Sequence, residues 1–164
     1  MKYENFNDAE VLKIAINMEG EGLAFYSSLA KSVKDPKVKE IFSILADEEE
    51  DHLADFRKAY SDLTSSRDSS QGYEDYTIDE YIKHLVETGV FTQKDEVKRL
   101  TAEIKTDLDA LRIGIQAEKD AILFYTEASR NTKNKEGQKT FEFLASEEKK
   151  HLKLLADIMR TLKK

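Results

Sequence analysis

The 164-residue sequence contains no cysteine and only one proline. Without cysteine the chain has no disulfide, no thiol nucleophile, and no cysteine-ligated zinc or iron–sulfur centre. The absence fits a reducing compartment, and we expect a cytoplasmic protein. Only six glycines accompany the single proline, so helix-breaking residues are scarce. The sequence therefore predicts a largely α-helical, all-α fold.

Long apolar runs and an excess of basic residues are also missing. Nowhere do about 18 apolar residues follow one another, which argues against a membrane-spanning helix, and the first residues do not form a secretory signal. The 26 Lys and Arg residues face 33 Asp and Glu residues, for a net charge of −7, which disfavours phosphate backbones and anionic lipids. We expect neither nucleic acid nor a membrane among the partners.

Apolar residues recur at helical spacing over four long segments, which end at about residues 32, 60, 130 and 162. Each segment begins at a residue or pair of residues that favours a helix start: Asn7 or Asp8, Asp35-Pro36, Thr106 or Asp107, and Asn134. The sequence thus predicts four long helices.

The connections arrange these helices in two pairs within a single domain, 1–164. Only about three residues join the first helix to the second, and the third and fourth are joined as tightly, which makes each pair antiparallel neighbours. Pair 1 spans about residues 7–61 and pair 2 about 106–164. The crossover, about 62–105, is expected to hold a short helix opened by a capping box at 77–80 and a further helical piece at 93–104. One long crossover is the connectivity of a ferritin-like four-helix bundle, whereas cytokine-type bundles have two.

The sequence repeats itself with an offset of 99 residues. Residues 15–60 align with 114–159 without a gap, and residues 45–52 fall on 144–151. Many charged positions differ between the copies, but four chemically informative ones recur: Glu19 as Glu118, Tyr26 as Tyr125, Glu49 as Glu148, and His52 as His151. Two similar helix pairs can pack about a pseudo-two-fold axis, so a residue that points at the axis has a twin in the other half.

Each half places a Glu-x-x-His motif and a separate glutamate on apolar helix faces. A spacing of three puts Glu49 and His52 on the same face of the second helix, and the fourth helix repeats the motif. The separate glutamates lie on the apolar stripes of the first and third helices. Six side chains are therefore expected to point inward: Glu19, Glu49, His52, Glu118, Glu148 and His151.

Four buried carboxylates require compensating positive charge, because an unpaired buried carboxylate is costly. Two divalent cations would balance the four negative charges, and neutral imidazoles would add nitrogen ligands. Oxygen and imidazole donors suit iron or manganese and do not exclude zinc. The set is also that of ferritin-like di-iron and di-manganese carboxylate proteins. We expect two iron ions, with manganese or zinc as alternatives.

Tyr26 and Tyr125 follow Glu19 and Glu118 by seven residues, two turns along the same face. One interpretation is that both are ordinary core residues. The other is that each phenol donates a hydrogen bond to a ligand carboxylate on a neighbouring helix and so takes part in the chemistry of the site.

Two further glutamates are alternatives for the ligand set. Glu48 and Glu147 lie four residues before the histidines and could compete for the metal, but the three-residue spacing favours Glu49 and Glu148. His84, in the crossover, has no twin and is expected at the surface or in packing.

The stretches that hold Glu19, Tyr26 and the first Glu-x-x-His motif, together with their repeats, resemble the rubrerythrin branch of the ferritin-like superfamily. They resemble in particular its erythrin-type forms without a rubredoxin domain. The resemblance implies a non-haem di-iron centre that reduces hydrogen peroxide in oxidative-stress defence. Rubrerythrins usually carry a cysteine-ligated iron, so electrons would here come from an external donor such as a rubredoxin-like protein. They also usually place another glutamate one turn after the first ligand of the third helix, where this chain has Ala121, with Gly22 as its twin.

The resemblance leaves the reaction open. The leading hypothesis is an oxidoreductase that reduces hydrogen peroxide or oxygen. The alternatives are iron binding and storage, which needs a closed shell of many subunits, and a di-iron oxidase or oxygenase, which needs an apolar substrate cavity. We also expect a homodimer, which a long crossover would allow to form by exchange of a helix pair.

Overall fold

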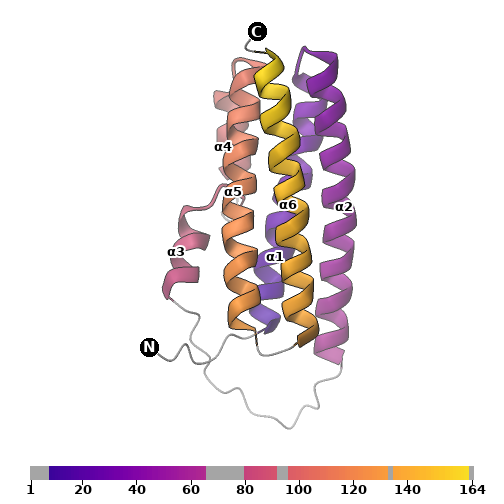
Figure 1. Cartoon of the computed structure of the whole chain (residues 1–164), viewed down its shortest axis with the longest axis vertical. Helices are drawn as coiled ribbons and strands as arrows, with labels where there is room; N and C mark the ends of the chain where they lie inside the picture. Colours follow the sequence, from indigo (N-terminus) through magenta and orange to yellow (C-terminus); the bar gives the residue numbers. More distant parts are fainter. Residues whose placement is uncertain (1–7, 66–79, 92–95, 133–134, 163–164) are drawn as a thin grey trace.

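Four long helices form a bundle in the computed structural model (Figure 1). The structure describes residues 8–65, 80–91, 96–132 and 135–162. Two shorter helices lie on the outer side of the bundle, α3 against α5 and α4 against α1. The elements in chain order are α1 Asp8–Ser32, α2 Pro36–Ser65, α3 Glu80–Thr88, α4 Glu96–Glu103, α5 Asp107–Asn131 and α6 Lys135–Leu162. The ferritin-like four-helix bundle is the observed fold.

The turn between α1 and α2 is short and is held from both sides. Asp35 Oδ1 accepts hydrogen bonds from the backbone N–H groups of Lys37 (2.8 Å) and Val38 (3.2 Å), as expected for a helix that begins at Pro36. At the start of α5, the Asp107 carboxylate accepts a hydrogen bond from the backbone N–H of Asp35 (2.7 Å). The turn of the first pair is thus tied to the beginning of the second.

Helix α5 begins with a capping box. Thr106 Oγ1 accepts a hydrogen bond from the N–H of Asp109 (3.1 Å), and Asp109 Oδ2 accepts one from the N–H of Thr106 (3.0 Å). Of the two caps predicted here, Thr106 is the one observed. The expected signals at Asn7, Asn134 and residues 77–79 lie outside the described residues.

The aromatic core shows that the sequence repeat is also a structural repeat. Tyr26 packs on Phe42 with ring centroids 5.7 Å apart, and the twin rings of Tyr125 and Phe141 lie 6.2 Å apart. All four rings are buried. The same contacts therefore recur on both sides of the pseudo-two-fold axis.

The segment after α3 covers one side of this core and lies outside the repeat. The ring of Phe91 packs against Phe25 and Tyr26, with centroids 5.2 and 6.0 Å apart. Asp120 on α5 accepts a hydrogen bond from the backbone N–H of Val90 (3.0 Å), which holds the segment in place. Among the helices that the structure describes, none has the length and apolar character needed to cross a bilayer.

Candidate metal centre

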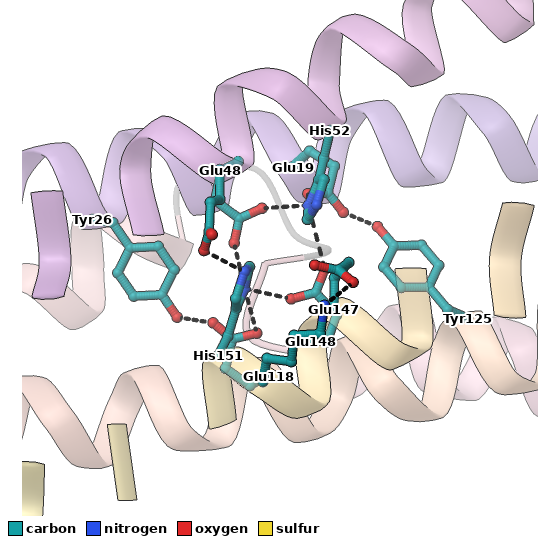
Figure 2. Close-up of polar contacts among 11 residues, drawn as sticks. Glu19, Tyr26, Glu48, His52, Glu118, Tyr125, Glu147, Glu148 and His151 are labelled. Carbon is teal, nitrogen blue, oxygen red and sulfur yellow. Dashed lines mark hydrogen bonds and ion pairs between the residues drawn. The ribbon is translucent and has the colours of Figure 1, made fainter. Parts of the chain in front are cut away.

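The six candidate ligands lie together at the middle of the four long helices. Helices α1 and α5 each contribute one glutamate, and α2 and α6 each contribute a Glu-x-x-His motif (Figure 2). Every one of the six is buried, with relative exposure of 8% for His52 and 4% or less for the others. The helical periodicity that predicted inward-pointing side chains is therefore what brings them together.

The donor atoms form two overlapping groups, in each of which all atoms lie within 4.8 Å of one another. The first group consists of Glu19, Glu49, His52 and Glu148, and the second of Glu49, Glu118, Glu148 and His151. Glu49 and Glu148 belong to both groups. Their carboxylates therefore lie where they could bridge two metal ions, a distinction that the sequence pattern did not make.

Several buried polar atoms of this cluster have no hydrogen-bond partner within the described part of the chain: Glu19 Oε2, both carboxylate oxygens of Glu148, and the Nδ1 atoms of His52 and His151. The Nδ1 atom of His52 lies 3.4 Å from Glu19 Oε2, and that of His151 lies 2.9 Å from Glu148 Oε2. Each unpaired buried polar group costs about 1–3 kcal/mol. Four carboxylates and two inward-facing imidazole nitrogens fit a pair of divalent cations, which would satisfy all of these atoms.

Burial and mutual repulsion act on the two shared carboxylates. Burial raises the pKa of Glu49 well above the ordinary glutamate value, and the negative charges of Glu19 and Glu148 raise it further. Burial and the charge of Glu118 likewise raise the pKa of Glu148 well above its ordinary value. The cluster therefore takes up protons when no cation neutralises it.

Two other members of the cluster favour their charged forms. Burial opposes a charge on His151, but the nearby carboxylates of Glu118 and Glu148 raise its pKa to about 11. Burial also opposes a charge on Glu19, but its polar neighbours Glu49, His52 and Tyr125 lower its pKa below the ordinary value. Protons and positive charge are thus held within a few ångströms of four carboxylates, at the place where a metal would bind.

Two buried tyrosines link the glutamates of the two halves. The Tyr26 hydroxyl on α1 donates to Glu118 Oε1 on α5, and the Tyr125 hydroxyl on α5 donates to Glu19 Oε1 on α1. The rings lie on opposite sides of the cluster (Figure 2). Burial and the adjacent carboxylate charge raise the pKa of both phenols well above the ordinary value, so both keep the proton that they donate. Each tyrosine is thus a core residue and also a hydrogen-bond donor to a candidate ligand.

The alternative residues lie outside the two donor groups. Glu48 Oε2 lies 3.0 Å from His151 Nε2, and Glu147 Oε1 lies 2.5 Å from Lys150 Nζ. His84 on α3 is exposed. Sequence reasoning did not find the contact of Glu48 with His151, because the two residues are on different helices and no local spacing joins them.

Gly22 stands one turn after Glu19 and lies against a shared carboxylate. A Cβ atom at this position would be 3.2 Å from Glu49 Cδ, 3.4 Å from Glu49 Oε1, and 3.4 Å from the ring of Phe91. Its twin on α5 is Ala121. The glycine allows Glu49 to approach the backbone of α1 closely, and no carboxylate is present at either position.

Comparison with known proteins identifies the family. The sequence model of the family described as Rubrerythrin matches residues 10–159. The chain belongs to the rubrerythrin family. A search of curated proteins finds no match. Family membership agrees with the resemblance that the repeated glutamate and histidine motifs predicted.

Solved structures with the same fold include the following two proteins. A hypothetical protein from Pyrococcus furiosus has a TM-score of 0.68 and 26% identity, covering 96% of this chain and 90% of that one. A candidate ferritin-like diiron-carboxylate protein from Thermotoga maritima has a TM-score of 0.65 and 26% identity, covering 97% of this chain and 98% of that one. The likeness extends over nearly the whole length of each chain.

Proposed function

We propose that this rubrerythrin-family chain is a di-iron oxidoreductase that reduces hydrogen peroxide with electrons from an external donor. The observation that carries the proposal is the buried cluster of four glutamates and two histidines, whose possible metal-binding atoms converge; several of these atoms have no hydrogen-bond partner among the described residues. The membership of the family supports the choice of iron and of peroxide.

The grouping of the donor atoms suggests how the residues would divide the work. Glu49 and Glu148 would hold both ions, because each belongs to both groups. Glu19 and His52 would complete one position, and the remaining pair, Glu118 and His151, the other. Held by these residues, a ferrous pair would supply the two electrons that, with two protons, reduce one hydrogen peroxide to two water molecules.

The surrounding residues fix the carboxylates and exclude water. The phenols of Tyr26 and Tyr125 each hold one oxygen of Glu118 or Glu19 by a hydrogen bond, which limits the orientations of that carboxylate. Phe91 packs on one side of the cluster and Phe56 stacks on Tyr125 on the other, with ring centroids 5.7 Å apart. A dry surrounding strengthens every electrostatic interaction within the site.

The source of electrons lies outside this chain. The sequence has no cysteine, so it contains no cysteine-ligated iron to pass electrons to the centre. We therefore expect a small redox protein of the rubredoxin type to act as the donor, and re-reduction to limit turnover.

Stopped-flow oxidation tests the proposed reaction. Protein loaded anaerobically with two ferrous ions per chain is mixed with hydrogen peroxide or with oxygen at equal concentration. We expect peroxide to react faster. Oxygen reacting faster would favour a ferritin-like or oxidase role, and a native mass of many subunits would favour storage over the expected homodimer.

A matched pair of variants shows whether the cluster is the iron site. Glu49→Gln should lose bound iron and the peroxide reaction. Glu50→Gln, which changes an exposed glutamate at the next position of α2, should keep both. Equal iron content and equal rates in the two variants would contradict the assignment.

A further inference from the structure

The two histidines of the candidate metal centre have different surroundings on the side that faces away from the cluster. The Nδ1 atom of His151 faces the cluster, 2.9 Å from Glu148 Oε2 and 3.7 Å from Glu118 Oε2. Its Nε2 atom lies 3.0 Å from Glu48 Oε2 (Figure 2). One ring nitrogen of His151 is thus directed at the metal position, and the other at a carboxylate on α2.

The repeat relates this contact to Glu147 and His52, but the twin contact is not formed. In the described ranges no hydrogen bond or ion pair joins these two residues, and Glu147 Oε1 instead lies 2.5 Å from Lys150 Nζ. The position equivalent to Lys150 on α2 is Asp51, which is acidic. The lysine that holds Glu147 therefore has no counterpart beside Glu48.

We propose that Glu48 is a positioning residue that orients His151 and makes the metal position beside His151 the tighter of the two, filled first. The inference rests on the proposed di-metal function. When the neutral imidazole binds a metal through Nδ1, a carboxylate that accepts a hydrogen bond from Nε2–H fixes the direction of the ring and makes the ligand nitrogen more basic. Among the described residues, the carboxylate contacts of His52 all involve Nδ1, so no such partner faces its Nε2 atom.

Charge adds to this difference. The Glu48 carboxylate places a negative charge beside the position of His151, which attracts a cation. The charge of Glu147 is offset by Lys150 in direct contact. Both effects favour the same position, so the pseudo-symmetric site is expected to bind its two ions with unequal affinity.

Glu48 is also a residue that can be changed without disturbing the core. Its side chain is 45% exposed, whereas that of His151 is 2% exposed. Glu147 provides a matched control, because it occupies the same position in the other half and contacts Lys150 instead of a histidine. Thermal unfolding of the two variants verifies that both fold.

Titration of the metal-free protein with cobalt(II), followed by visible absorption, tests the affinities. We expect the unmodified protein to bind two ions in two distinct steps. Glu48→Ala should weaken the tighter step by roughly 10- to 100-fold, while Glu147→Ala should change either step by no more than about threefold. His151→Ala should remove the tighter step and His52→Ala the weaker one.

NMR of the histidine ring N–H protons in the zinc-loaded protein supplies a second measurement, which would not change if Glu48 had only a structural role. The ring Nε2–H signal of His151 should be shifted downfield by its carboxylate partner, and Glu48→Ala should abolish that shift. Glu48→Gln keeps an acceptor but removes the charge, so it should retain the signal and give an intermediate affinity. Glu147→Ala should leave the signal unchanged.

The possible failures separate the two proposals. If the unmodified protein binds two cobalt ions and Glu48→Ala has no larger effect than Glu147→Ala, or if the two steps have equal affinity, the positioning role of Glu48 is wrong and the di-metal centre stands. If the unmodified protein binds fewer than two ions, the proposed function is wrong and this inference falls with it.

Discussion

Replacing Gly22 by alanine measures how closely α1 must approach the shared carboxylate of Glu49. The added Cβ would lie 3.2 Å from Glu49 Cδ and 3.4 Å from the ring of Phe91. Both neighbours are part of the packed centre of the bundle, so one of them has to move by a few tenths of an ångström. A shift of Glu49 would affect both metal positions, because this residue belongs to both donor groups.

Two opposing effects determine how much Gly22→Ala changes the free energy of unfolding of the metal-free protein. Alanine is favoured over glycine inside a helix by about 1 kcal/mol. Overpacking a filled core costs roughly 1–3 kcal/mol. Gly22→Ala should therefore lower the free energy of unfolding by up to about 2 kcal/mol, and a displaced Glu49 should weaken metal binding by about tenfold or more, as a disturbed support of a ligand does.

Gly20 is a matched control two residues away on the same helix. A Cβ atom at Gly20 would meet nothing within 4 Å. Gly20→Ala should therefore raise the free energy of unfolding by about 1 kcal/mol and leave metal affinity unchanged. Urea unfolding of both variants without metal, together with cobalt(II) titration, gives the two quantities. If Gly22→Ala matches Gly20→Ala in stability and in affinity, the close approach of Glu49 has no energetic importance.

Further predictions concern pH, the tyrosines and oxidation. In the metal-free protein Glu49 and Glu148 have raised pKa values and bind more protons folded than unfolded, so stability should fall as pH rises above the ordinary glutamate range. His151, with a pKa of about 11, adds stability that is also lost as pH rises. Metal-loaded protein should instead gain stability between about pH 5 and 7, because protons compete with the metal. Thermal melts of both forms give the dependence of the melting temperature on pH, and identical melting of the two forms would contradict a buried cluster. Tyr26→Phe and Tyr125→Phe should each change the rate of ferrous oxidation while metal analysis still finds two ions. Loss of the metal in either variant would indicate that the tyrosine is itself needed to hold it. Both histidines should stay bound to the metals after oxidation, because no spare carboxylate stands one turn after Glu19 or Glu118. Structures in the two oxidation states would reveal any exchange of ligands.

The residues of the cluster were predictable because helical spacing determines which side chains share a face. Glu49 and His52 lie three apart among apolar neighbours, so the burial of one implies the burial of the other. The second Glu-x-x-His motif, at Glu148 and His151, lies among the same kinds of neighbours, so the two motifs together indicate a shared site. The helix starts at Pro36 and after Thr106 followed from local hydrogen bonds within a few residues, which sequence also encodes.

Most contacts between helices were not predictable, because they depend on how the two pairs pack. Residue spacing allowed Tyr26 to donate to a ligand carboxylate on a neighbouring helix, but it did not identify Glu118 as that carboxylate. It gave no reason for Phe91 to cover the site or for Glu48 to meet His151. The end of α2 was also missed. The apolar pattern ends near residue 60, but the helix continues to Ser65, with Leu63 partly buried against the core. In its last turns the Thr64 hydroxyl donates to the carbonyl of Tyr60 (2.9 Å).

The reciprocal hydrogen bonds of the tyrosines are those of an isologous interface, in which residue i of one subunit meets residue j of its copy and j meets i. Tyr26 donates to Glu118 and Tyr125 donates back to Glu19, at equivalent positions of the repeat. A single helix pair binding an identical copy of itself would make both bonds and would place its metal centre on the symmetry axis. Gene duplication and fusion of such a subunit would yield the present chain. In such a dimer every substitution at the site would occur twice, whereas in a single chain each half can change alone.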